Sequence, residues 1–303
     1  MLQSPPARNF NDGIDKSVTT PEILYRLARR PLQSRPGQHR SRAPGAGLDV
    51  HGFAPLVVHP DARRLDVHAS ARDPFHQWIV RLPRQRSAAT LIVLADLSAS
   101  MAFGEPARKL DVLADLLDAL GHSAWRAGDS LAFAGADDAV QEQWTLAPTR
   151  SRGASAELAQ RLRAAQLGGR GADAVALTAR RFGRRRDSLF FLVSDFHWPD
   201  AQLEAACAAL AGREVVPVVL WARHEFDDWP RRGVAEVQDL ESGERRIVWF
   251  RPVLAETMAR LGAQRRAQLR QRFAQYGWRP FFCNGDLDSS AFNAYFHGED
   301  RAD

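Results

Sequence analysis

The run LIVLADLSASM, residues 91–101, is the most informative part of this chain. Its first five residues are apolar without interruption, which is typical of a central strand buried on both faces of a parallel sheet. Asp96, Ser98 and Ser100 follow at every second position, where the strand should end and a loop begin. Their carboxylate and hydroxyl oxygens suit a small divalent cation such as Mg²⁺. The serines equally suit a loop backbone or a helix cap, so this run alone leaves both interpretations open.

A second fully apolar run also ends in a carboxylate. SLFFLVS, residues 188–194, is followed directly by Asp195, a second carboxylate at a strand end. Strands alternate with helical patterns over roughly 200 residues, which predicts an α/β fold with a doubly wound, mostly parallel sheet. Right-handed crossovers would then bring Asp96 and Asp195 to one carboxyl edge of that sheet. A cap for the helix expected over Pro199–Leu210 is the alternative role of Ser194 and Asp195.

Three regions are expected along the chain. They are a loosely ordered lead-in over 1–20, an N-terminal β-containing extension over 21–87, and the α/β domain over 88–298. Within the extension, periodicity and composition predict a short helix, a basic Gly/Pro-rich loop and two short strands. These are assigned to Pro21–Arg30, Ser34–Phe53, Leu65–His68 and Trp78–Leu82. Near the end of the chain, Glu241–Glu244 reads as a hairpin turn between two strands.

Composition limits the classes of function. The formal net charge is +5 and comes from arginine, since Lys16 and Lys109 are the only lysines. The densest basic run, residues 180–186, suits a solvated face better than a nucleic-acid site because it offers no aromatic stacking platform beyond Phe182. Cys207 and Cys283 are far apart and predict neither a disulfide framework nor a zinc site. No apolar run could cross a bilayer and none near the start resembles a secretory signal, so a cytoplasmic protein is expected.

Two motifs in the correct order carry a family resemblance. A Pro-Asp-Ala-Arg-Arg-Leu-Asp run at 60–66, followed by Ala-Arg at 71–72, precedes the Asp-x-Ser-x-Ser-Met strand end at 96–101. This arrangement resembles the bacterial family catalogued as domain of unknown function 58, which shows Gly-Asp-Asp-x-Arg-x-Ile-Asp-Trp-x-x-x-Ala-Arg before that strand end. The chain departs from the pattern at His59 and Pro60, and at Val67, where the family has Trp.

The resemblance implies a von Willebrand factor A-like, Rossmann-type domain with a metal-ion-dependent adhesion site. In that fold the first and fourth strands are neighbours, and the site residues are carried over here as Asp96, Ser98, Ser100 and Asp195, holding Mg²⁺ or Mn²⁺. The family also supplies a threonine from a Gly-Gly-Thr-Asp loop, but Ala172 stands at the matching position and its methyl group cannot bind a metal. Asp173 is therefore either a substitute ligand or a loop and helix-cap residue.

The resemblance also implies a function. Family members are thought to act with MoxR-type AAA+ ATPases as chaperone-like assemblies that mature client proteins or insert metal into them. A non-enzymatic interaction protein is therefore expected, with the ATPase and a client as partners; the chain itself has no Walker A motif. Two alternatives stay open. One is a basic nucleic-acid-binding module, and the other is a Mg²⁺-dependent phosphohydrolase with Asp96 as nucleophile, although Ser98 stands where a second acid is usual.

Overall fold

A six-stranded sheet forms the centre of the protein. The computed structural model describes residues 20–27, 36–104, 107–169, 171–185, 188–226, 229, 232–238 and 245–298. The strand order in the sheet is β10 (Phe281–Asn284), β7 (Glu214–Trp221), β6 (Ser188–Ser194), β3 (Thr90–Asp96), β4 (Ser130–Ala136) and β5 (Val140–Thr149). Neighbouring strands are parallel except for β4 and β5. The prediction of a mostly parallel α/β sheet is confirmed.

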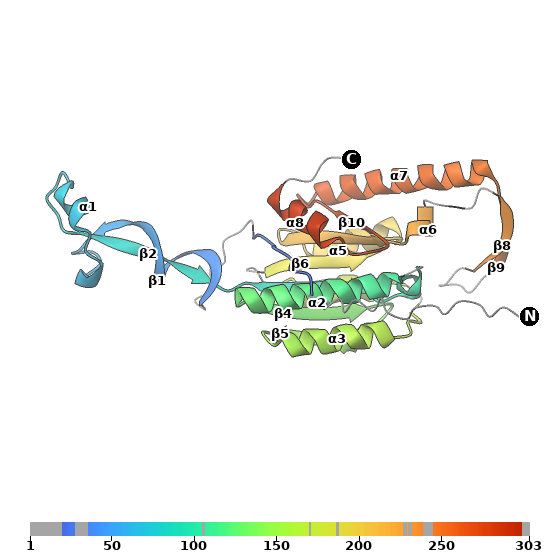
Figure 1. The fold of residues 1–303 in the computed structure, drawn as a ribbon, viewed down its shortest axis with the longest axis horizontal. Helices are drawn as coiled ribbons and strands as arrows, with labels where there is room; N and C mark the ends of the chain where they lie inside the picture. Colours follow the sequence, from blue (N-terminus) through green and yellow to red (C-terminus); the bar gives the residue numbers. More distant parts are fainter. Residues whose placement is uncertain are drawn as a thin grey trace, which may run out of the picture.

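Helices cover both faces of this sheet (Figure 1). They are α2 (Lys109–Ala127), α3 (Arg152–Ala164), α4 (Asp173–Phe182), α5 (Asp200–Ala209), α7 (Pro252–Ala274) and α8 (Ser289–His297). Leu91 and Val93 of β3 belong to one core cluster with residues of α2, α3 and α8. Ile92 and Leu94 belong to a second cluster with residues of α4, α5 and α7. Because alternate residues of a strand point to opposite faces, this division is consistent with double winding.

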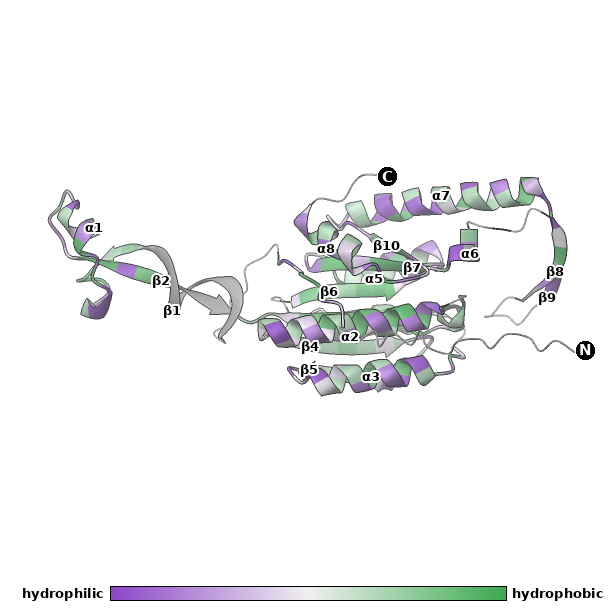
Figure 2. Cartoon of the chain, viewed as in Figure 1, coloured by the Kyte–Doolittle hydropathy of each residue, from purple (hydrophilic) through white to green (hydrophobic). Residues whose placement is uncertain are grey.

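Both central strands are apolar along their whole length because neither face meets water. Every residue of β3 and of β6 is buried. The surrounding helices instead alternate hydrophilic and hydrophobic residues, as Figure 2 shows for α2 and α7. The polar residues that follow β3 and β6 therefore mark the points where the chain leaves the core after each strand.

The N-terminal extension is a two-stranded ribbon that projects from the sheet domain (Figure 1). It pairs β1 (Pro36–Pro55) with β2 (Ile79–Ser87) in antiparallel register, and carries the 3-10 turn η1 (Ala62–Arg64) and helix α1 (Val67–Ala71) at its far end. The loop expected over Ser34–Phe53 is wrong from Pro36 onward, because pairing with β2 overrides the Gly and Pro content.

Two further expectations for the extension are wrong. Instead of a strand over Leu65–His68, Leu65 forms a single bridge to Val80, and α1 begins at Val67 because the Asp66 carboxylate accepts a hydrogen bond from the Ala69 N–H at 3.0 Å. The helix expected over Pro21–Arg30 is absent from residues 21–27, while residues 28–30 lie outside the described residues.

The segment at 21–27 is not helical, and other elements bind part of its backbone. The Ile23 N–H donates to Ser123 Oγ on α2 at 2.8 Å, and the Leu24 N–H donates to Asn293 Oδ1 on α8 at 2.6 Å. Ile23 itself is buried in the core. Tertiary contacts thus replace the hydrogen bonds that a local helix would have made.

A smaller two-stranded unit lies beyond the sheet near the start of α7. It consists of β8 (Gly233–Gln238) and β9 (Arg245–Phe250), which are antiparallel and follow the short helix α6 (Arg223–Phe226). The strands of the expected hairpin are confirmed, and its turn at Glu241–Glu244 lies outside the described residues. Among the helices of the described residues, none combines the length and apolar character needed to cross a membrane.

Candidate functional site

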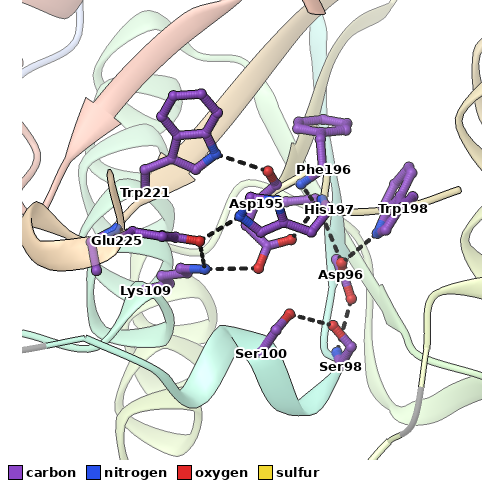
Figure 3. Close-up of polar contacts among 12 residues, drawn as sticks. Asp96, Ser98, Ser100, Lys109, Asp195, Phe196, His197, Trp198, Trp221 and Glu225 are labelled. Carbon is purple, nitrogen blue, oxygen red and sulfur yellow. Dashed lines mark hydrogen bonds and ion pairs between the residues drawn. The ribbon is translucent and has the colours of Figure 1, made fainter. Parts of the chain in front are cut away.

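The carboxyl ends of β3 and β6 meet at Asp96 (Figure 3). Asp96 is the last residue of β3 and is buried. Its Oδ1 accepts a hydrogen bond from the Ser98 N–H at 2.8 Å, and its Oδ2 accepts from Ser194 Oγ and from Trp198 Nε1, each at 2.8 Å. Both carboxylate oxygens of Asp96 are thus held by protein donors.

The environment of Asp96 disfavours its charge. Burial, followed by the nearby Asp195 carboxylate, raises the pKa of Asp96 to about 6, although the donors from Ser98 and Ser194 oppose this shift. A cation close to Asp96 and Asp195 would stabilise the ionised form of Asp96.

Ser98 and Ser100 lie in the turn that follows β3. Their hydroxyl oxygens are 3.1 Å apart and share a hydrogen bond. Ser98 precedes the 3-10 turn η2 (Ala99–Ala102) but makes no side-chain cap to it, so the capping alternative is not what the structure adopts. The turn is fixed by Gly169, whose carbonyl accepts from the Ala99 N–H at 2.9 Å. Two hydroxyl oxygens are thereby presented together, next to Asp96.

Asp195 forms the other half of the site and is neutralised by a lysine. Its Oδ2 accepts a hydrogen bond from Lys109 Nζ at 2.8 Å, and its Oδ1 accepts from the His197 N–H at 3.1 Å. Lys109 Nζ also donates to Glu225 Oε1 at 2.8 Å, and His197 Nε2 contacts the same oxygen. Lys109, at the start of α2, and Glu225, in α6, were both missed by sequence reasoning.

These charges stabilise one another inside the protein. Burial raises the pKa of Asp195, but the Lys109 ammonium and His197 outweigh that effect and hold it below its usual range. Burial lowers the pKa of Lys109, yet Asp195 and Glu225 together raise it above its usual value. Lys109 therefore stays charged as a built-in counterion. The signal that could have drawn attention to it is its rarity, as one of two lysines among 41 basic residues.

The chain turns sharply directly after Asp195. Phe196 has a φ of 54°, which is uncommon for a bulky residue. The turn is supported by the Phe196 N–H, which donates to Ser194 Oγ at 2.9 Å, and by Arg265 Nη2, which donates to the Phe196 carbonyl at 2.7 Å. Helix α5 begins at Asp200 after Pro199, which makes no side-chain cap. Ser194 and Asp195 thus bind within the site and do not cap α5.

The remaining predicted ligand is not part of this arrangement. Asp173 begins α4, is exposed, and accepts a hydrogen bond from Gln202 Nε2 on α5. Among the described residues, the acidic groups close enough to share a metal ion are Asp195 and Glu225, together with His197, and Asp173 is not one of them. Ala172, the preceding residue, is buried and occupies the N-cap position of α4, where its side chain makes no hydrogen bond. The structure thus unites Asp96, Ser98, Ser100 and Asp195 at one edge and leaves Asp173 aside.

A second set of ligand atoms lies against the first. One atom each from Asp195, His197 and Glu225 lie within 4.8 Å of one another, which is a distance that a metal ion could bridge. Lys109 already contacts both carboxylates of this set, so a metal there would compete with an ammonium group. The hydroxyls of Ser98 and Ser100 bind each other, and among the described contacts neither meets a lysine.

These features define an α/β protein with an oxygen-rich site at the carboxyl edge of its sheet. A family described as "Protein of unknown function DUF58" matches residues 58–268, and the chain belongs to this family. An "Uncharacterized protein in moxR 3'region" of Paracoccus denitrificans is 40% identical over 94 residues, which are 30% of this chain and 88% of that protein. An uncharacterized protein of Mycobacterium tuberculosis is 28% identical over 238 residues, which are 77% of this chain and 73% of that protein.

The chain also matches solved structures at low sequence identity. The conserved hypothetical protein BatB from Bacteroides thetaiotaomicron is 15% identical, with a TM-score of 0.40, over 70% of this chain and 96% of its own. An aerotolerance-related membrane protein from Bacteroides fragilis is 16% identical, with a TM-score of 0.41, over 69% of this chain and 96% of its own.

Proposed function

We propose that this chain is a non-enzymatic docking protein that works with a MoxR-type AAA+ ATPase in the chaperone-like maturation of client proteins. Membership of the DUF58 family and the relative named from the moxR 3' region support the association with MoxR. The observation that carries the proposal is the pair of hydroxyls of Ser98 and Ser100, held 3.1 Å apart at the sheet edge beside buried Asp96. Such an edge can receive an acidic side chain of a partner.

The proposal includes a von Willebrand factor A-type domain. The adjacency of β3 and β6, the first and fourth strands of the sheet in chain order, supports it. So does the gathering of Asp96, Ser98, Ser100 and Asp195 at the carboxyl ends of those strands. In an open parallel sheet this edge is the usual place for a ligand.

The donor set fits Mg²⁺ or Mn²⁺ as a site that a partner completes. Ser98 and Ser100 offer two hard oxygens, and Asp96 with Asp195 supplies negative charge, which is the chemistry such ions require. Ala172 supplies no oxygen, and Lys109 already neutralises Asp195. A bound ion would link the serine hydroxyls to a carboxylate of the partner. We propose that its affinity for this chain alone is weak.

The surroundings of Asp96 favour docking over catalysis. A phosphoryl-accepting aspartate needs an oxygen lone pair directed at its substrate. Here Asp96 is buried, and both of its oxygens accept hydrogen bonds from Ser98, Ser194 and Trp198. Ser98, at the position where a second acid is usual, shares its hydroxyl with Ser100.

Binding of a purified MoxR-type ATPase to the immobilised chain tests this function. We expect Ser98→Ala/Ser100→Ala to raise the Kd at least tenfold, because the docking hydroxyls are lost while the buried carboxylates stay in place. Thr257→Ala, which removes an exposed hydroxyl from α7, is the matched control and should leave the Kd unchanged. Equal binding by the serine variant would remove this edge from the docking function.

Calorimetry with Mg²⁺ tests the metal part separately. We expect Ala172→Thr to bind Mg²⁺ more tightly than the natural chain, because it returns the hydroxyl that the family pattern contains. Ala172→Val has a similar shape without the hydroxyl and is the control. If Ala172→Thr binds Mg²⁺ no more tightly than Ala172→Val, the edge remains a docking surface that uses no metal.

A further inference from the structure

The far end of the N-terminal ribbon exposes apolar side chains that nothing described so far uses. We call residues 53–78 the tip; they include η1 and α1 (Figure 1). Val57 is 93% exposed and Phe75 is 77% exposed. Four more large apolar side chains of the tip are over half exposed, namely Phe53, Val58, Val67 and Trp78. Monomeric proteins rarely expose apolar patches larger than a few hundred Å², and larger ones mark interaction sites.

The tip is a folded unit, so this exposure does not come from a frayed end. The Leu56 N–H donates to the Trp78 carbonyl at 2.6 Å, and the Asp66 N–H donates to the Ile79 carbonyl at 2.8 Å. Ser70 Oγ accepts from the Ile79 N–H at 2.8 Å and so ties α1 to β2. A surface held in this way loses little conformational entropy when a partner binds.

The charges of the tip favour a polypeptide over a lipid surface as its partner. Residues 53–78 contain three arginines and three aspartates, which balance. Asp61 pairs with Arg64 at 3.1 Å, and Asp66 pairs with Arg81 of β2 at 2.6 Å. Segments that bind membrane surfaces combine apolar residues with an excess of Lys and Arg. The tip has the apolar residues without that excess.

The tip and the candidate site lie at opposite ends of the sheet domain. Ribbon strand β2 ends at Ser87 and leads into the amino end of β3 at Thr90. Asp96, Ser98 and Ser100 stand at the carboxyl end of the same strand. A partner on the tip therefore leaves the carboxyl edge free for a second partner (Figure 1).

We propose that the tip binds an apolar, uncharged stretch of an incompletely folded client polypeptide. This inference rests on the proposed function, in which the carboxyl edge docks the ATPase, and it names the surface that meets the client. The chain then bridges the two. Apolar burial of side chains such as Val57 and Phe75 supplies the affinity.

The test uses fluorescently labelled, reduced and carboxymethylated α-lactalbumin, a chain that stays unfolded, and measures its anisotropy as the full-length protein is added. We expect saturable binding, with a Kd that rises at least tenfold in Val57→Ser/Phe75→Ser, since two apolar anchors are lost. Ile247→Ser in β9 is the control, because Ile247 is 78% exposed but lies in the unit near the start of α7. An unchanged melting temperature shows that the variants fold.

Three results would overturn the inference. The first is equal binding of the probe by the natural chain and the tip variant, or an equal loss in Ile247→Ser. The second is binding to phosphatidylglycerol vesicles that the tip variant abolishes, which would make a membrane the occupant. The third is a dimer in sedimentation velocity that the tip variant dissolves, which would make the occupant a second copy. The probe assay contains no ATPase. Its result therefore does not depend on whether Ser98→Ala/Ser100→Ala weakens binding of the ATPase, and the two proposals can fail separately.

Discussion

Replacing Lys109 by Met should destabilise the protein strongly, although the new side chain has a similar length. Lys109 is 3% exposed, and its two partners Asp195 and Glu225 are 1% and 13% exposed. At an effective dielectric constant of about 20, each 2.8 Å contact contributes roughly 6 kcal/mol of attraction, most of which offsets the cost of burying the charges. Removing Lys109 takes the ammonium away from the buried Asp195 carboxylate and leaves Glu225 with its contacts to His197 and the Ala222 N–H, for which a loss of ~3–5 kcal/mol is expected.

The pH dependence of this loss has a defined sign. In the natural chain the pKa of Asp195 is lowered, so its pairing stabilises the fold above the unfolded pKa of about 4 and is lost as the pH falls through the folded value. Without Lys109, burial raises the pKa of Asp195. Protonation of Asp195 then removes the buried charge that destabilises the variant. The difference in unfolding free energy between the two chains should therefore be largest at pH 7–8 and should shrink towards pH 4.

Urea unfolding followed by tryptophan fluorescence measures this difference. Trp198 and Trp221 are suitable reporters because their indole N–H groups donate to Asp96 and to the Asp195 carbonyl. Arg163→Met, which breaks an exposed ion pair to Asp115, is the control and should cost less than about 1 kcal/mol. A loss below about 1 kcal/mol for Lys109→Met, or a loss that grows towards acidic pH, would refute the assignment of Lys109 as the internal counterion.

Two further changes test other parts of the structure. Gly169→Ala should lower stability by about 1–3 kcal/mol in urea unfolding, because its Cβ would lie 2.5 Å from the Asp137 Cβ; unchanged stability would contradict the close packing of this loop. Asp66→Ala should speed hydrogen exchange in α1 while exchange in β3 stays slow. The backbone donor from Ala69 and the Arg81 guanidinium lower the pKa of Asp66, so α1 of the natural chain should lose protection from exchange, relative to the intrinsic rate of a free amide, as the pH falls below about 4.

Much of the sheet could be predicted because its signals are local. The apolar runs at residues 91–95 and 188–194 are strands buried on both faces, and such strands need no partner to be recognised. The polar residues after them were correctly expected to meet, since parallel neighbours end at the same edge. The helix expected over Pro199–Leu210 is present as α5 at Asp200–Ala209.

The errors fall where long-range pairing overrides composition. The segment of β1 is rich in Gly, Pro and Arg, and only its pairing with β2 makes it a strand. Residues 21–27 have a helical pattern but form no helix, because Ser123 and Asn293 bind their backbone from far along the chain.

The sequence alone therefore establishes an α/β sheet with Asp96, Ser98, Ser100 and Asp195 at one edge, because burial and strand direction are written in short runs of residues. It does not reveal that a lysine supplies the positive charge of that edge. Lys109 lies 86 residues before Asp195 and 116 residues before Glu225, and no local pattern connects them. A buried charge is stable only beside its partners, and the tertiary fold alone brings these partners together.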